Sequence, residues 1–294
     1  MTTAISPSEP QQRANWFQTL PAVWVAGLVA IGYGPTLTGI VGSWFDSNAD
    51  MGHGIAVPFV AAYMVWTKQT VLSRLAPAPN MWGLLLVLWG TVQFTIASAA
   101  DWIFATRISF VISLAGCVMC LWGLPVLRTL AYPLGLLFMM VAPPTFLQAQ
   151  LTLQLQLIAS RLAEMGLDAL GYSVLRDGNI LEMVGERLAV AEACSGIRSL
   201  SALVFFCLTY NYLLVPKIGI RWALLAAVVP LAVLGNAGRI VATGVVGQYN
   251  RALAHGMLHE TWGYITVLIA GGLLVALHVM ILRGQRFFRR SRAF

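Results

Sequence analysis

Charged residues are scarce in this sequence. Asp, Glu, Lys and Arg together make up 10% of its 294 residues, whereas soluble domains contain about 25%. Hydrophobic residues reach 59%, and the mean hydropathy is +0.77. A soluble fold of this length could not hide so much apolar surface from water, which excludes a soluble protein. The composition predicts a chain that crosses a membrane several times.

Cysteines are also few, and no basic face can be recognised. Three of the four cysteines, Cys117, Cys120 and Cys207, lie in apolar runs, so a secreted disulfide framework is not expected. The net charge of +7 is spread over short stretches and one tail without an aromatic-studded basic surface, which argues against nucleic acid as a partner. Residues 1–18 are polar and irregular, so no removable signal peptide is expected.

Eight apolar stretches are long enough to cross a bilayer, which takes about 20 residues of helix. The predicted spans are 20–42, 54–72, 82–100, 102–124, 129–147, 197–215, 221–245 and 261–283. Only Asp101 separates the third span from the fourth, which predicts a tight helical hairpin. No internal repeat or linker divides the chain, so we predict an all-α polytopic membrane protein with a single domain, residues 1–294.

Basic residues indicate how the chain is oriented. The tail 283–294 carries five arginines, and the positive-inside rule places such a segment in the cytoplasm. Because an even number of spans returns the chain to its starting side, the tail 1–18 is expected on the same side. We therefore predict a multi-pass protein of a bacterial inner membrane, with both tails, 1–18 and 284–294, in the cytoplasm.

One connection, residues 148–196, is long enough to have structure of its own on the outer side. Its first part repeats leucine at helical spacing with polar residues between, which is typical of an amphipathic helix lying at the membrane interface. Gly171 ends this pattern. A turn signal at Asp177-Gly178-Asn179 stands between short alternating runs and predicts a small periplasmic β-hairpin.

Three polar motifs stand at the outer ends of the last three predicted spans. They are residues 191–199 (AEACSGIRS), 235–240 (GNAGRI) and 255–260 (HGMLHE). Placing an ionisable residue at membrane depth costs free energy, so each such residue is expected to have a function or a partner there. In the predicted topology all three motifs reach the periplasmic face, which makes this end of the protein the candidate site.

The first motif contains a candidate nucleophile. Cys194 follows Glu192 and precedes Ser195 at the point where the outer segment enters the sixth span. Backbone N–H groups at a helix N-terminus favour a thiolate and can bind an oxyanion, and Arg198 adds positive charge one turn along. A buried, inert cysteine is the alternative interpretation, and it is the one that fits Cys207 in the middle of the same span.

The other two motifs contain a cation and two histidines. An unpaired guanidinium in lipid costs at least about 2.5–3.5 kcal/mol, so Arg239 should face the bundle interior, with Asn236 on the same helix face. Snorkelling of Arg239 to the headgroups is the alternative. His255 and His259 are four residues apart, so either could be a general base, and His53 is a further candidate for the same cavity.

A thiol, an imidazole and a guanidinium on one membrane face are the groups that nucleophilic acyl transfer requires. The thiolate attacks a carbonyl carbon, the imidazole supplies and removes protons, and the arginine stabilises the oxyanion. The spacing of the three motifs makes this chemistry a reasonable hypothesis for the protein.

These motifs resemble those of the exosortase/archaeosortase family, membrane cysteine transpeptidases of the PEP-CTERM sorting type. The resemblance covers roughly residues 45–280. It is carried by Glu192-Ala193-Cys194-Ser195-Gly196-Ile197-Arg198-Ser199, by Asn236-Ala237-Gly238-Arg239-Ile240, by His259 with Gly263-Tyr264, and by Gly52-His53-Gly54-Ile55-Ala56-Val57-Pro58, in which Gly52 replaces the family's serine.

The resemblance implies roles for individual residues and a class of substrate. Cys194 would be the nucleophile, Arg239 the transition-state stabiliser and His259 the acid/base, without a metal or other cofactor. The substrate would be an exported protein with a C-terminal sorting signal, made of a short Pro-containing motif, a transmembrane helix and a basic tail. Cleavage through a Cys thioester at the outer membrane face would pass the remaining chain to an unidentified acceptor. Family members accompany exopolysaccharide export.

Two other classes of function remain open from the residues alone. A zinc intramembrane protease would use His255, His259 and Glu260, but H-x-x-x-H-E lacks the order of the H-E-x-x-H arrangement. A transporter or flippase for an anionic lipid-linked sugar would line its path with arginines of several spans. These arginines are Arg107, Arg198 and Arg239.

Overall fold

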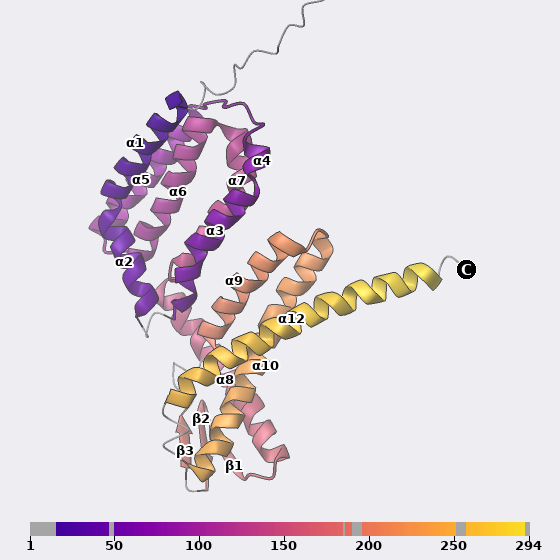
Figure 1. Ribbon diagram of the computed structural model, residues 1–294. Helices are drawn as coiled ribbons and strands as arrows, with labels where there is room; N and C mark the ends of the chain where they lie inside the picture. Colours follow the sequence, from indigo (N-terminus) through magenta and orange to yellow (C-terminus); the bar gives the residue numbers. More distant parts are fainter. Residues whose placement is uncertain (1–15, 47–49, 185, 190–195, 251–256, 292–294) are drawn as a thin grey trace, which may run out of the picture. The chain divides into compact units, whose positions relative to one another are not determined.

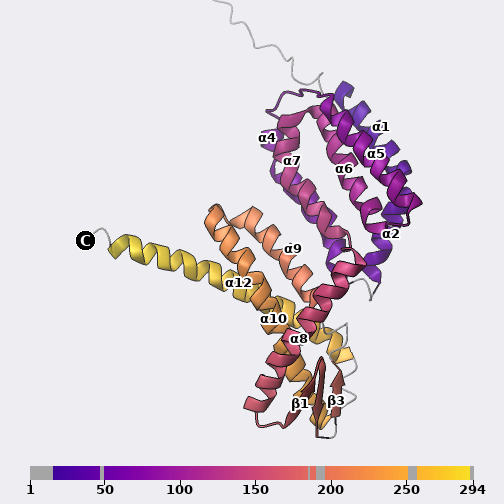
Figure 2. The same cartoon turned by 180° about the vertical axis from the view of Figure 1, so that it is seen from behind.

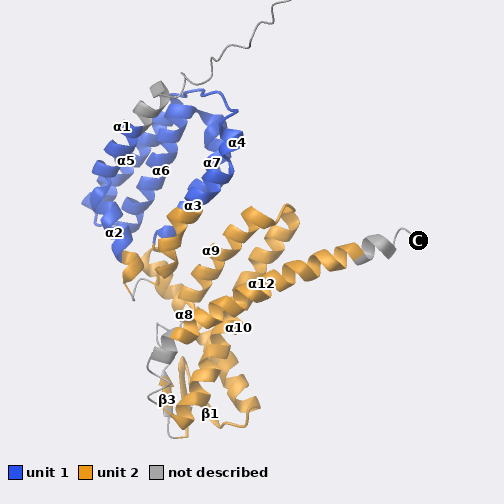
Figure 3. Ribbon diagram, in the orientation of Figure 1, with its two compact units in different colours: residues 1–42, 61–141 blue, residues 43–60, 142–294 orange. Residues whose placement is uncertain are grey.

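The described part of the chain consists almost entirely of helices, with one small sheet (Figure 1). This computed structural model describes residues 16–46, 50–184, 186–189, 196–250 and 257–291. The chain divides into two units, which Figure 3 shows in different colours. Unit 1 contains residues 1–42 and 61–141, and unit 2 contains residues 43–60 and 142–294.

Unit 1 is made of helices from the first half of the chain. Its elements are α1 (Trp16–Gly32), α2 (Gly34–Phe45), α3 (Ala56–Thr67), α4 (Gln69–Leu72), α5 (Trp82–Ala99), α6 (Ile103–Trp122), α7 (Leu124–Leu136) and the 3₁₀ turn η2 (Leu137–Met140). The ends of α2 and α3 that adjoin residues 43–60 belong to unit 2. Helices α5 and α6 form the predicted hairpin, and Asp101 in its turn has a left-handed backbone with φ 51°.

Polar contacts join the first two helices of unit 1 to α6. The axes of α1 and α2 differ by 71° at Tyr33, where glycines on both sides and Pro35 interrupt the helix. The Tyr33 hydroxyl lies 2.8 Å from Ser113 Oγ, and Arg107 Nη2 donates to the Gly39 carbonyl at 2.8 Å. These contacts satisfy polar groups in an otherwise apolar bundle.

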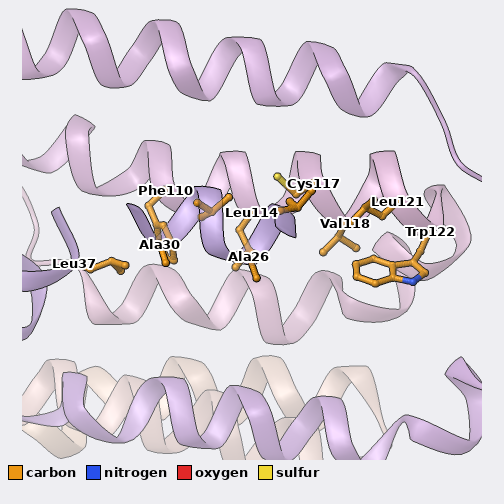
Figure 4. A pocket seen from close by; sticks show the side chains of 11 residues that line it. Ala26, Ala30, Leu37, Phe110, Leu114, Cys117, Val118, Leu121 and Trp122 are labelled. Atoms are coloured by element: carbon orange, nitrogen blue, oxygen red, sulfur yellow. The ribbon is translucent and has the colours of Figure 1, made fainter. Parts of the chain in front are cut away.

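An apolar hollow of about 280 Å³ lies between α1 and α6 (Figure 4). Phe110, Leu114 and Trp122 of α6 line one side of it, and the thiol of Cys117 is a polar group among its lining side chains. Cys117 and Cys120 are free thiols in the described structure. The hollow offers no set of groups that would support acyl transfer.

Unit 2 contains the elements that adjoin the three polar motifs. They are the 3₁₀ turn η1 (Gly52–Ile55), α8 (Thr145–Ala169), the strands β1 (Val174–Asp177), β2 (Ile180–Met183) and β3 (Glu186–Ala189), and the helices α9 (Ile197–Leu214), α10 (Ile218–Tyr249) and α12 (Met257–Ser291). Helix α10 packs against α8, α9 and α12, and Figure 2 shows α8 and the sheet beside the last part of α10. A buried core of Leu203, Cys207, Leu224, Val228 and Leu274 joins α9, α10 and α12.

The three strands form an antiparallel sheet in the order β1-β2-β3. The predicted hairpin is confirmed, because Asp177 pairs with Ile180 across a two-residue loop. The positive φ of 60° falls on Gly178, the first loop residue, as in a type II′ turn. Strand β3 pairs with β2 and extends the hairpin to a three-stranded sheet.

Helix α8 covers the sheet. Its residues Ala159, Ala163 and Leu167 are buried against Leu181 of β2, in a cluster that includes Ile240 of α10. The predicted helix after residue 148 is therefore present. Its small residues and Leu167 pack on the protein itself, whereas Leu151, Leu153 and Ile158 are exposed. Tyr172 follows α8, and its hydrogen bond to Tyr249, at the end of α10, raises the pKa of Tyr172. An ion pair of 2.7 Å joins the sheet to α8, between Arg176 Nε and Glu164 Oε2.

Among the described residues, five helices are long and apolar enough to cross a membrane. They are α5, α6, α9, α10 and residues 261–286 of α12. Two bent pairs, α1 with α2 and α7–η2 with α8, raise the number to seven if each pair is one span. The predicted number of eight is not confirmed. The predicted span 54–72 is interrupted at Lys68, which leaves α3 with only 12 residues.

Candidate active site

Helix α10 carries the two polar residues of the second motif on one buried face. Asn236 and Arg239 are three residues apart, and three-residue neighbours adjoin each other on a helix surface. Asn236 is 3% exposed and Arg239 is 7% exposed. The guanidinium of Arg239 therefore faces the packed helices of unit 2. A cation held there cannot lose its charge, and low polarity around it strengthens its attraction for an anion.

Arg239 lies against the first part of α12. A Cβ atom placed on Gly263 would be 3.4 Å from Nη1 and 3.7 Å from Cζ of Arg239. The guanidinium thus occupies the space next to α12 that a larger side chain at position 263 would need. Gly263 follows His259 by one helical turn. His259 belongs to the first turn of α12, but its side chain is outside the described part of the structure.

Helix α9 begins against Asn236. Its N-cap is Gly196, which has φ 80°, a left-handed conformation that other residues adopt only with strain. A Cβ atom on Gly196 would lie 3.1 Å from both Cγ and Nδ2 of Asn236. The chain therefore passes close to Asn236 two residues after Cys194. Four candidates, Glu192, Cys194, Ser195 and His255, fall outside the described residues.

Three segments that are far apart in the sequence meet within unit 2. Gly196 at the start of α9 contacts Asn236, and Gly263 near the start of α12 contacts Arg239, one turn further along α10. A helix N-terminus carries partial positive charge, and a buried guanidinium adds a full one. Both features favour a negatively charged group in their neighbourhood.

Arg198 is held by an acid that the sequence analysis did not include in the site. Arg198 Nε donates to Asp50 Oδ1 at 2.8 Å, and Arg198 Nη2 lies 2.8 Å from the same oxygen. The Asp50 side chain is 14% exposed and that of Arg198 is 43% exposed. Asp50 therefore offsets the charge of Arg198, whereas Arg239 is the guanidinium at the meeting point of the three segments.

His53 lies in η1 and packs on α9. Its ring is tilted by 34° against that of Phe205, with 6.0 Å between the ring centroids. Phe205 follows Arg198 by seven residues, which is roughly 10 Å along a helix. His53 therefore lies beside the second and third turns of α9, closer than Arg198 to the C-terminal end of this helix.

A hollow of about 360 Å³ separates α10 from α12 next to Arg239. Arg239 and Trp262 contribute to its lining, and the remaining walls are mainly aliphatic. Both helices are among those long enough to cross a membrane. An apolar segment could thus approach the buried guanidinium from within the bilayer.

The fold and the site together define a multi-pass membrane protein with buried polar residues on α10 in its second unit. A model of the transmembrane exosortase family matches residues 44–276, well over half of the chain. The chain therefore belongs to the transmembrane exosortase family. This is a family of membrane cysteine transpeptidases and proteases that act on exported proteins with sorting signals. No curated protein and no solved structure matches the chain.

Proposed function

We propose that this chain is a membrane-embedded cysteine peptidase or transpeptidase that cleaves C-terminal sorting signals of exported proteins. Cys194 is the nucleophile, Arg239 stabilises the oxyanion, and His259 is the general acid and base. The supporting residues of the site are Glu192, Ser195, Arg198, Asn236, His53 and His255. No metal or other cofactor takes part in this proposal.

The proposed reaction is an acyl transfer in two steps. The Cys194 thiolate attacks the carbonyl carbon of the scissile peptide bond, and the carbonyl electrons move to the oxygen, next to Arg239. The tetrahedral intermediate collapses to a thioester as His259 protonates the leaving amine. Water or another nucleophile then attacks the thioester carbonyl, His259 takes the proton from it, and the thiolate is released.

The observation that carries this proposal is that the starts of α9 and α12 both lie against the face of α10 that carries Asn236 and Arg239. Gly196, two residues after Cys194, packs on Asn236, while Gly263, one turn after His259, packs on Arg239. The family of the chain supports the same chemistry. The alternative of a flippase, in which arginines line a path for an anionic lipid-linked sugar, has less support. Asp50 offsets the charge of Arg198, one of these arginines.

The proposed substrate matches the membrane setting of the site. It is an exported protein that ends in a short Pro-containing motif, a transmembrane helix and a basic tail. The positive-inside rule favours the cytoplasm for that tail and for the arginine-rich C-terminal tail of the enzyme. We propose that both termini of the enzyme lie in the cytoplasm and that cleavage occurs at the periplasmic face of the inner membrane. We propose that the reaction accompanies the export of surface proteins and exopolysaccharide.

Processing of a reporter with a candidate sorting signal tests the proposal. Cells with Cys194→Ala should accumulate the uncleaved reporter, and the wild-type enzyme should give a thioester adduct that hydroxylamine releases. Cys207→Ala is the matched control, because Cys207 is fully buried in the apolar core of α9, α10 and α12 and should allow normal cleavage. Normal processing by Cys194→Ala would refute the proposal. A chelator should have no effect, and inhibition by it would favour the zinc protease.

A further inference from the structure

The hollow between α1 and α6 lies in unit 1, and its walls consist almost entirely of hydrocarbon (Figure 4). The residues of α6 that line it run from Phe110 to Trp122, which is about 18 Å along a helix. The hydrocarbon core of one leaflet is about 15 Å thick, half that of the bilayer. Because α6 is long and apolar enough to cross a membrane, the hollow follows this helix over about the depth of one leaflet.

An apolar hollow of this kind in a bilayer is expected to be filled by hydrocarbon. Protein interiors are closely packed, and a cavity with aliphatic walls does not hold water. The volume of about 280 Å³ is too small for a helix, since about 18 Å of helix with a diameter of about 10 Å takes about 1,400 Å³. An extended acyl chain is much narrower, and the small side chains of Ala26 and Ala30 on α1 leave room for it.

A cation lies beyond one end of this hollow. Arg107 precedes Phe110 by three residues and Leu114 by seven, so all three lie on the same face of α6. Arg107 Nη2 donates to the Gly39 carbonyl at 2.8 Å, and Gly39 follows Leu37, another lining residue, by two positions. Side chains on a helix lean toward its N-terminus, so the guanidinium is directed to the membrane interface at which α6 begins.

The charge of Arg107 is not neutralised by the protein. Within the described part of the chain, no acidic side chain forms an ion pair with it. A guanidinium has five N–H groups, and the Gly39 carbonyl accepts from one of them. Because the side chain is only half-buried, other N–H groups can reach a group outside the protein. The anion that a bilayer provides next to an acyl chain is a phosphodiester, which suits the planar fork of an arginine.

We propose that this hollow is the binding site of one phospholipid with a net negative headgroup. One acyl chain lies in the hollow along α6, and the phosphate binds the guanidinium of Arg107 in the leaflet where α6 begins. The lipid fills the space between α1 and α6 and neutralises the one charged residue of α6. The site belongs to unit 1, so it does not depend on the proposed peptidase activity.

Native mass spectrometry of the full-length protein in detergent tests the role of Arg107. The protein is titrated with phosphatidylglycerol and with phosphatidylcholine of the same acyl chains. We expect one phosphatidylglycerol per chain, bound about tenfold more tightly than phosphatidylcholine, the effect of about one charge-assisted hydrogen bond. Arg107→Gln should remove this preference, and Arg107→Lys, which keeps the charge, should retain part of it. Arg128→Gln is the matched control, because Arg128 is an exposed arginine of α7 outside the hollow and its loss should leave the preference intact.

A second pair of variants tests the place of the acyl chain. Ala26→Leu fills part of the hollow from α1, so both lipids should bind at least about tenfold more weakly, since several methylene groups lose their site. Gly27→Leu is the control, because position 27 is outside the lining and a Cβ there would meet nothing within 4 Å. Phosphatidylglycerol should raise the unfolding temperature of the wild type and of Gly27→Leu, with little effect on Ala26→Leu. Equal binding by the two leucine variants, or a lipid preference that persists in Arg107→Gln, would overturn the proposal.

Photocrosslinking in native membranes identifies the occupant. p-Benzoylphenylalanine in place of Phe110 keeps an aromatic ring in the wall of the hollow, and the same residue in place of Trp24, which is 71% exposed on α1, samples the surrounding bilayer. Adducts at position 110 should be enriched in anionic phospholipid relative to those at position 24. The same lipid composition at both positions, or an adduct at position 110 with a protein segment, would show that the hollow is not a phospholipid site.

Discussion

The contact between Arg239 and Gly263 gives a quantitative test of the proposed oxyanion role. A Cβ on residue 263 would lie 3.4 Å from Nη1, an ordinary van der Waals contact, so Gly263→Ala should remain close to wild type. Valine adds methyl groups about 1.5 Å beyond Cβ, and a methyl that points at the guanidinium would come within about 2 Å of it. The guanidinium must then move by about 1 Å or more. For a group that acts in the transition state, such a shift can cost about a hundredfold in rate, or about 2.7 kcal/mol.

The assay is the initial rate of reporter cleavage in membranes, normalised to the amount of inserted enzyme. Gly272→Val is the matched control, because Gly272 lies on the same helix and a Cβ there would meet nothing within 4 Å. It introduces the same β-branched residue into α12, so any effect of helix propensity is shared. We expect a large loss with Gly263→Val alone. Equal rates for the two valine variants would refute the placement of Arg239 at the reacting carbonyl.

Two further predictions concern the surroundings of Asn236 and Arg239. Arg239→Lys keeps the charge but loses the planar fork of donors, so kcat should fall about 10²–10³-fold; near-normal turnover would contradict the oxyanion role. Gly196→Ala and Gly171→Ala should each lose about 1–2 kcal/mol of stability, measured by thermal unfolding, because both glycines are left-handed. Only Gly196→Ala should also reduce cleavage, since its Cβ would press on Asn236 and that of Gly171 meets nothing; equal activities would contradict this.

Local patterns in the sequence were sufficient to predict several elements. The α5–α6 hairpin and the long helices α9, α10 and α12 follow from apolar runs of spanning length. The β1–β2 hairpin follows from Asp177-Gly178-Asn179, because the turn needs a positive φ at one position and glycine provides it at no steric cost. These features depend on residues close together in the chain, so a single sequence contains the information.

The direction of a helix was less predictable than its existence. The apolar run 20–42 indicates enough length for a span, yet the structure bends it by 71° at Tyr33. The run that includes α7 ends in η2 and meets α8 at 78°. Hydropathy reports how much apolar surface a segment has, while its path depends on interruptions such as Pro35 and on contacts with other helices.

The sequence by itself determined that the chain is a membrane protein and which residue types could serve acyl transfer, because composition and motif spacing are properties of the chain alone. Tertiary structure alone decided which of them meet. It places Arg239 against Gly263 and joins Arg198 to Asp50, 148 residues away. Helical periodicity repeats every few residues and indicates only which side chains share a face. Which face a distant segment covers depends on the packing of the whole unit, and this is why Asp50 became visible only in the structure.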